Sequence, residues 1–194
     1  CGAFLLSRQK FIPKNFLMLM VVITMYFSGG LIPTFLLYKN TYHLYNSYLA
    51  LLLPGAISSW NLIVMRTSFQ GIPRELEESA YIDGANDFVV LIRVILPLST
   101  ATVAVMALFY GVSHWNSWFA AMIYLEDRSK YPLQLFLREM LVLKDGAGVT
   151  TEEEMLAENL KYATIVVATV PILFIYPFIQ RYFVKGVMVG ALKG

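Results

Sequence analysis

Four stretches of this chain are almost wholly apolar, and each is long enough to cross a lipid bilayer. They cover approximately residues 16–37, 48–69, 90–112 and 160–180, and a shorter apolar run occupies residues 1–6. Roughly 20 helical residues span the hydrocarbon core of a membrane. We therefore predict an all-α fold, a polytopic transmembrane helix bundle that forms one domain over residues 1–194.

The composition excludes most other classes of protein. Charged residues make up 14% of the chain, whereas a typical soluble domain has about 25%. A soluble helical protein would also need long amphipathic helices to cover these stretches. The net charge of +2 gives no reason to expect a nucleic-acid partner, and a single cysteine excludes a disulfide framework or a multi-cysteine zinc site.

The distribution of Lys and Arg predicts an orientation. The connections fall on two sides of the bundle, with residues 7–15, 66–93 and 181–194 on one side and residues 38–47 and 113–161 on the other. The first side holds nine Lys and Arg and the second holds six. Because cytoplasmic loops carry the excess of Lys and Arg, we expect the first side, including the C-terminus, to be cytoplasmic.

Proline and glycine recur within the apolar stretches, which favours a bundle with a solute pathway over a set of straight anchors. Two groups of polar and aromatic residues are candidates for lining that pathway, because amides and indoles suit sugars. Each group has a second interpretation, as an interhelical hydrogen bond for the first and as an interfacial aromatic belt for the second. The candidates are Ser59, Trp60, Asn61, Trp115, Asn116 and Trp118.

Motifs for catalysis are missing from the sequence. The glycines form no phosphate-binding G-x-x-x-x-G-K-[ST] loop, and His43 and His114 stand alone, without the spacing of a metal site. No Asp, Glu or Lys lies at the centre of a predicted span, where proton- or sodium-driven carriers often have one. We predict that the chain is not an enzyme, binds no metal or cofactor, and takes its energy from another subunit.

Charged residues concentrate in residues 71–93, which we call the elbow. Pro73 and three glutamates predict a helix start, and residues 74–83 form a short helical pattern. Gly84 suits a left-handed helix end, and Asn86 suits the start of a second helix that leads into the membrane. We expect a helix–glycine–helix corner on the cytoplasmic surface, with Ala80 and Gly84 on one face.

A longer motif runs from the elbow into the third apolar stretch. Glu78-Ser79-Ala80 is followed at fixed spacing by Gly84, Val94 and Leu96-Pro97. This pattern resembles the E-A-A loop of the inner-membrane permeases of binding-protein-dependent ABC importers. Ser79 replaces an alanine and Val94 an isoleucine. The string EESAYIDGA and the C-terminal GVMVGALKG are similar to the carbohydrate subclass, the relatives of the maltose-system permeases.

The resemblance implies a type I ABC importer permease with about six transmembrane helices. The first helix and most of the second would then lie outside this sequence, so we expect an N-terminally truncated bundle. The elbow would be the coupling helix that docks on the ATPase. Glu78 would make the polar contact, Ala80 and Gly84 would permit close approach, Asp83 would support the turn, and Leu96-Pro97 would mark entry into the next span. We expect these residues, with Ser79, to form the ATPase-coupling site.

The resemblance also implies partners and a location. These are a cytoplasmic ABC ATPase dimer that uses ATP and Mg, a second permease subunit, identical or different, an extracytoplasmic solute-binding protein, and membrane lipid. The subunit would lie in the inner or plasma membrane of a bacterium or archaeon and cross it several times. Residues 113–159 would be extracytoplasmic. Residues 126–161 would lie against the binding protein, with an amphipathic helix over residues 133–143.

The predicted function is import of a sugar or oligosaccharide by alternating access. The same machine importing a non-sugar solute is the alternative, and a membrane enzyme or assembly protein is a third, less favoured one. The pathway residues are too few and too generic to name the solute.

Overall fold

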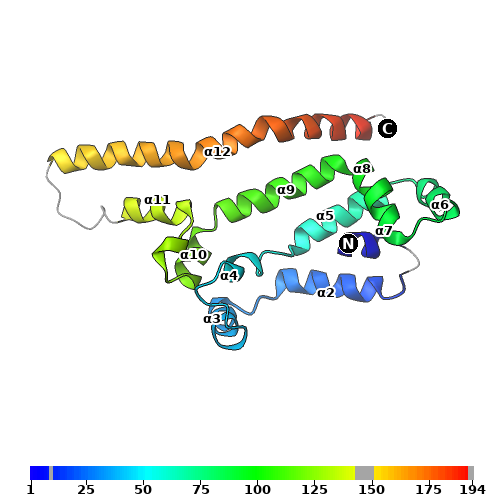
Figure 1. Ribbon diagram of the computed structural model, residues 1–194, viewed down its shortest axis with the longest axis horizontal. Coiled ribbons are helices and arrows are strands. Elements are labelled where there is room, and N and C mark those ends of the chain that lie inside the picture. The colour runs from blue at the N-terminus through cyan, green and yellow to red at the C-terminus, as the bar shows by residue number, and fades with distance from the viewer. Residues whose placement is uncertain (9–10, 143–150, 192–194) are drawn as a thin grey trace. The chain divides into compact units, whose positions relative to one another are not determined.

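The computed structural model describes residues 1–8, 11–142 and 151–191 of the chain, and these residues form helices and connecting loops (Figure 1). The helices belong to two compact units. Unit 1 comprises residues 1–29, 56–108 and 181–194, and unit 2 comprises residues 30–55 and 109–180. Helices α9 and α12 run from one unit into the other, and each unit is described by itself.

Unit 1 contains the elbow and the helices that support it. In chain order its elements are α1 (Gly2–Ser7), α2 (Lys14–Tyr26), α5 (Ser59–Gln70), α6 (Glu75–Ile82), α7 (Asp87–Val90), the π turn η2 (Leu91–Ile95), α8 (Leu96–Leu98) and the first part of α9 (Thr100–Trp115).

The core of unit 1 forms where α1 packs against α5 and the elbow packs against both. Short α1 contacts α5 more extensively than it contacts any other element, and the two helices lie side by side in Figure 1. Apolar side chains removed from water supply the main favourable term for such packing. The buried cluster consists of Ala3, Phe4, Phe69, Val90, Leu91 and Ile95.

A corner at Ser99 separates the elbow from the long helix α9. The helical segment from Asp87 to Leu98 meets α9 at an angle of 88°. Pro97 has no N–H to donate to the preceding turn, which accounts for the break in the regular ladder. The wider turn η2 lies directly before it.

Unit 2 is held together around a loop residue, Asn46. Its backbone N–H donates to the Tyr124 carbonyl at 2.8 Å, and its carbonyl accepts a bond from Lys130 Nζ at 2.8 Å. A small apolar core of Ala121, Leu125 and Leu135 includes the neighbour in sequence of Tyr124. The elements of this unit are α3 (Leu31–Leu36), the π turn η1 (Leu37–Thr41), α4 (Leu49–Leu52), the end of α9, α10 (Trp118–Tyr124), the 3-10 turn η3 (Arg128–Lys130), α11 (Leu133–Val142) and most of α12 (Thr151–Ala191).

The predicted spans correspond to helices, but most of them are interrupted. Among the described residues, one helix is long and apolar enough to cross a membrane, at Asn159–Phe178, or up to three if two bent helix pairs each count as one span. The predicted span 48–69 is divided into α4 and α5 by an irregular segment that contains Pro54 and Gly55, which the sequence offers as breakers. Likewise, the span predicted over 16–37 breaks before Gly30, which has a φ of +84°.

The predicted amphipathic helix in residues 113–159 is present as α11. It buries Leu135 and Leu137 and ends at Val142. The glycine-containing part of that segment, residues 143–150, lies outside the described residues.

Candidate functional site

The first helix of the elbow begins where the sequence predicts. Pro73 precedes α6, and the backbone N–H groups of Glu77 and Glu78 each donate to the Arg74 carbonyl at 2.9 Å. Three glutamates stand in the first turn, where carboxylates interact favourably with the positive end of the helix dipole.

The end of α6 is a Schellman motif built around Gly84. The Gly84 N–H donates to the Tyr81 carbonyl at 3.0 Å, and the Ala85 N–H donates to the Ala80 carbonyl at 2.9 Å. Gly84 has a φ of +81°, a conformation that a side chain with a Cβ adopts only at a cost. The predicted left-handed corner at Gly84 is confirmed.

The second helix of the elbow is fixed by two side chains. Asn86 caps α7, because its Oδ1 accepts a bond from the Val89 N–H at 2.9 Å, as predicted. The Tyr81 hydroxyl donates to Asp87 Oδ1 at 2.6 Å and so bridges α6 and α7. Partial burial, and then the bond to Asp87, raise the pKa of the Tyr81 phenol to about 12. The corner is therefore closed by short-range bonds on both sides.

The residues of the E-A-A-type motif divide into an inward set and an outward set. Ala80, Val94 and Leu96 are partly buried and pack against the core cluster of unit 1. Ala80 thus packs within this chain, and its role in the close approach of a partner stays a prediction. The motif spacing is explained in part by the need to seat the elbow on α1 and α5.

The outward set forms an exposed surface on the elbow, which we call the docking face. It contains the predicted coupling residues Glu78, Ser79, Asp83 and Gly84, and Pro97 is exposed farther along the chain. A Cβ added at Gly84 would meet no described atom within 4 Å, so the space beside this glycine is open. Sequence reasoning missed Ile82, which is 85% exposed although it is apolar. Its position four residues after Glu78, on the same helix face, was the available signal.

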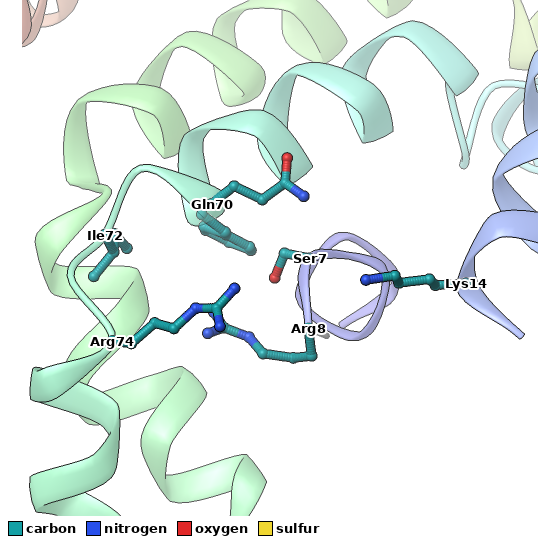
Figure 2. A pocket seen from close by; sticks show the side chains of 7 residues that line it. Ser7, Arg8, Lys14, Gln70, Ile72 and Arg74 are labelled. Atoms are coloured by element: carbon teal, nitrogen blue, oxygen red, sulfur yellow. The ribbon is translucent and has the colours of Figure 1, made fainter. Parts of the chain in front are cut away.

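A basic hollow of about 140 Å³ lies beside the elbow in unit 1 (Figure 2). Arg8 and Arg74 extend into the same space from the end of α1 and from the residue before α6, while Lys14 points toward the end of α1. Ser7 and Gln70 also line the hollow. Arg8 forms an ion pair with Glu77 of α6.

The candidate pathway residues fall into separate units and are not brought together within either unit as one site. In unit 1, Ser59 Oγ lies 3.1 Å from Thr24 Oγ1, Asn61 is buried, and Trp60 is 59% exposed. These contacts of Ser59 agree with its interpretation as an interhelical hydrogen bond.

In unit 2, both candidate tryptophans have partners within the chain. Trp115 Nε1 donates to the Ala168 carbonyl at 3.1 Å. The Arg138 guanidinium lies 3.7 Å from the centre of the Trp118 ring, at cation–π distance. Asn116 is exposed at the loop between α9 and α10. The pathway role of all six residues stays a prediction.

The part of the chain that the structure describes contains no cluster of side chains that could bind a metal ion. No three side chains from His, Cys, Asp and Glu gather there in a way that could hold an ion.

The chain as a whole is similar to known proteins. Residues 1–189 match the family model described as "Binding-protein-dependent transport system inner membrane component". The chain is 45% identical to the polygalacturonan/rhamnogalacturonan transport system permease protein YtcP of Bacillus subtilis, over 99% of this chain and 68% of that protein. It is 43% identical to protein LplC of the same organism, over 99% of this chain and 66% of that protein.

A solved structure is also similar. It is the crystal structure of a bacterial ABC transporter involved in the import of the acidic polysaccharide alginate, with a TM-score of 0.83 and 32% identity. The match covers 94% of this chain and 66% of that chain. The chain therefore spans about two thirds of the length of the proteins that it matches.

Proposed function

The chain belongs to the family of inner membrane components of binding-protein-dependent transport systems, and from that premise we propose that it forms the solute pathway of an ATP-driven importer for a sugar or oligosaccharide. The observation that carries this proposal is the elbow, whose E-A-A-type residues present an exposed docking face on a rigid corner. The names of the similar proteins, which refer to polygalacturonan, rhamnogalacturonan and alginate, support a carbohydrate as the solute.

The docking face suits a protein partner rather than lipid alone. It combines a carboxylate at Glu78, a bare apolar side chain at Ile82 and an open glycine at Gly84. A carboxylate of this kind can accept two hydrogen bonds from one Arg of the partner. We propose that the partner is a cytoplasmic ATPase subunit, present as a dimer, that hydrolyses ATP with Mg. This chain performs no hydrolysis itself.

Alternating access then follows from how the elbow is seated. The short-range bonds at Gly84 and Asn86 make α6 and α7 one body, and Ala80, Val94 and Leu96 attach that body to the core of α1 and α5. When ATP closes the ATPase dimer, the elbow moves and carries the packed helices with it. The pathway opens outward toward a solute-binding protein, and hydrolysis returns it, which is a population shift driven by a remote ligand.

The assembly that we propose contains this subunit, a second permease subunit, the ATPase dimer and an extracytoplasmic binding protein, in the plasma or inner membrane of a bacterium or archaeon. We propose that residues 126–161 lie against the binding protein. We propose that the pathway is lined by side chains from two parts of the sequence, namely Ser59, Trp60, Asn61, Trp115, Asn116 and Trp118.

The test is ATP-driven uptake by the full-length subunit with its ATPase in lipid vesicles. The panel of solutes contains an acidic oligosaccharide, a neutral oligosaccharide and a peptide. We expect saturable, ATP-dependent uptake of an oligosaccharide, and uptake of the peptide alone would contradict the proposal.

A docking variant tests the role of the elbow. Glu78→Lys should prevent co-purification of the ATPase, because a cation replaces the carboxylate on the docking face. Glu75→Lys serves as the matched control, since it changes an exposed glutamate one turn earlier on the same helix. Equal ATPase recovery with both variants would refute a docking role for Glu78.

A further inference from the structure

Two adjacent glutamates of α6 face in different directions. The side chain of Glu77 is 6% exposed, whereas Glu78 is exposed. Successive residues of an α-helix are about 100° apart around its axis, so one can point into the unit while the next points to a partner. The two carboxylates therefore differ in their exposure to solvent.

Glu77 forms an ion pair with Arg8, which follows the last residue of α1. The Arg8 side chain is 20% exposed, and its guanidinium lies 4.4 Å from the centre of the Phe4 ring. The pair joins segments that are far apart in the sequence, and no covalent connection near it holds α6 to α1. Removing one partner of such a buried pair leaves a charge without compensation.

The α1 end of this contact is itself anchored. Arg66 Nε, on α5, donates to the Leu6 carbonyl at 3.0 Å, close to Arg8 in the chain. A displacement that reaches Arg8 is therefore passed both to α1 and to α5. The ion pair therefore connects α6, which carries the docking face, with α1, and the Arg66 bond connects α1 with α5.

We infer that the Arg8–Glu77 ion pair is the link through which a movement of α6 displaces α1 and α5, so that Arg8 and Glu77 are positioning residues for coupling ATP use to transport. This inference rests on the proposed function. In this inference Glu77 transmits the movement of α6 to α1 and α5, and Glu78 binds the ATPase.

The basic hollow explains why the negative charge of Glu77 is more important for this contact than the size of its side chain. Arg8 and Arg74 extend into the same space there, and Lys14 also lines it (Figure 2). With Glu77 replaced by a neutral side chain, Arg8 keeps its charge among like charges, which repel in this partly buried setting. The elbow then loses its ionic attraction to α1, although a side chain of equal size and the apolar packing remain.

The experiment measures solute molecules transported per ATP hydrolysed, with the full-length subunit and its ATPase in vesicles. Glu77→Gln and Arg8→Gln should each lower this ratio about fivefold or more, as expected for loss of a coupling between two sites. The ATPase should still co-purify, because Glu78 is intact. The reversed pair Arg8→Glu with Glu77→Arg should regain most of the ratio, and Glu75→Gln should not change it. An unchanged ratio in both single variants would overturn the inference.

A reducible cross-link allows the same folded sample to be measured with and without the connection between residues 8 and 77. In a Cys1→Ser background, Arg8→Cys and Glu77→Cys are joined by a bifunctional thiol reagent that contains a disulfide. The linked, assembled transporter should have the wild-type ratio, and reduction of the same sample should lower it to the level of the single variants. The same ratio before and after reduction would overturn the inference. Failure of the proposed function gives a different result, because the wild-type protein would then show no ATP-dependent uptake.

Discussion

Each unit has a corner at a residue with a left-handed backbone, and the two corners are built differently. Gly84 in the elbow has a φ of +81°, and Asn46 in unit 2 has a φ of +57°. The bonds that close the Gly84 corner join residues at most six apart. The Asn46 side chain instead accepts bonds from the N–H groups of Glu126, at 3.3 Å, and Asp127, at 3.1 Å, about eighty residues along the chain.

The difference separates a corner that can move as one piece from a corner that holds distant segments together. None of the described residues touches the outer side of Gly84, so its surroundings can be supplied by a partner. Asn46 uses its side chain, its N–H and its carbonyl within unit 2. We expect changes at Gly84 to alter association and changes at Asn46 to alter stability.

The largest effect is expected at Asn46. Asn46→Ala should lower the free energy of unfolding by about 3 kcal/mol. The substitution removes the side-chain oxygen that accepts two hydrogen bonds, and alanine tolerates a positive φ poorly. Thermal unfolding in detergent measures the loss. Asn46→Gly keeps the backbone freedom and removes only the side-chain acceptor, so it should lose less. A melting temperature equal to that of the wild type for Asn46→Gly would show that the stability of unit 2 does not depend on the Asn46 side chain.

Gly84 should show a smaller loss of stability and a distinct effect on association. Gly84→Ala should cost about 1–2 kcal/mol from backbone strain alone, whereas Gly84→Asn should cost less, since asparagine adopts this conformation more readily. Both variants should bind the ATPase weakly, because either Cβ occupies the docking face. Titration of the purified subunit with ATPase measures this. Wild-type affinity of Gly84→Asn would mean that only the backbone conformation of Gly84 matters.

The cap at Asn86 tests whether the elbow depends on local bonds. Asn86→Ala should cost about 1 kcal/mol, which corresponds to about fivefold faster hydrogen exchange at the Val89 amide. Asn86→Asp keeps an acceptor and should exchange at nearly the wild-type rate. Exchange that is unchanged in the alanine variant would show that contacts beyond the corner fix α7.

The smallest effect is expected at Tyr81. Its pKa is raised from 10.0 to about 12, so the phenol stabilises the elbow fully below pH 10 and loses this contribution as the pH rises toward 12. Tyr81→Phe should remove about 0.5–1 kcal/mol at neutral pH. The difference in phenolate absorbance between wild type and Tyr81→Phe measures the titration. A midpoint near 10 would contradict the contact with Asp87.

The elbow was predictable because its signals are local. Glycine for a positive φ, asparagine for a helix start and glutamates in a first turn act on their immediate neighbours, and all three are found where the sequence placed them. The role of Gly84 in docking stays a prediction.

Contacts over long sequence separations were not predictable in the same way. Glu77 was interpreted only as part of a helix first turn, and nothing in the spacing connects it to Arg8. The sequence also did not predict that the span 48–69 is divided into α4 and α5, although its proline and glycine were recognised as helix breakers. Hydropathy measures how apolar a segment is and does not report whether its backbone stays helical.

The π turn over Leu91–Ile95 sets the rotational phase between helix α7 of the elbow and helix α8. A π turn holds about one residue more than an α turn, and one residue corresponds to about 100° of rotation around a helix. Deleting a single residue there would restore a regular helix and turn the docking face away from its present direction by about a quarter of a circle. For the docking that we propose, the length of this segment therefore matters together with the chemistry of the face.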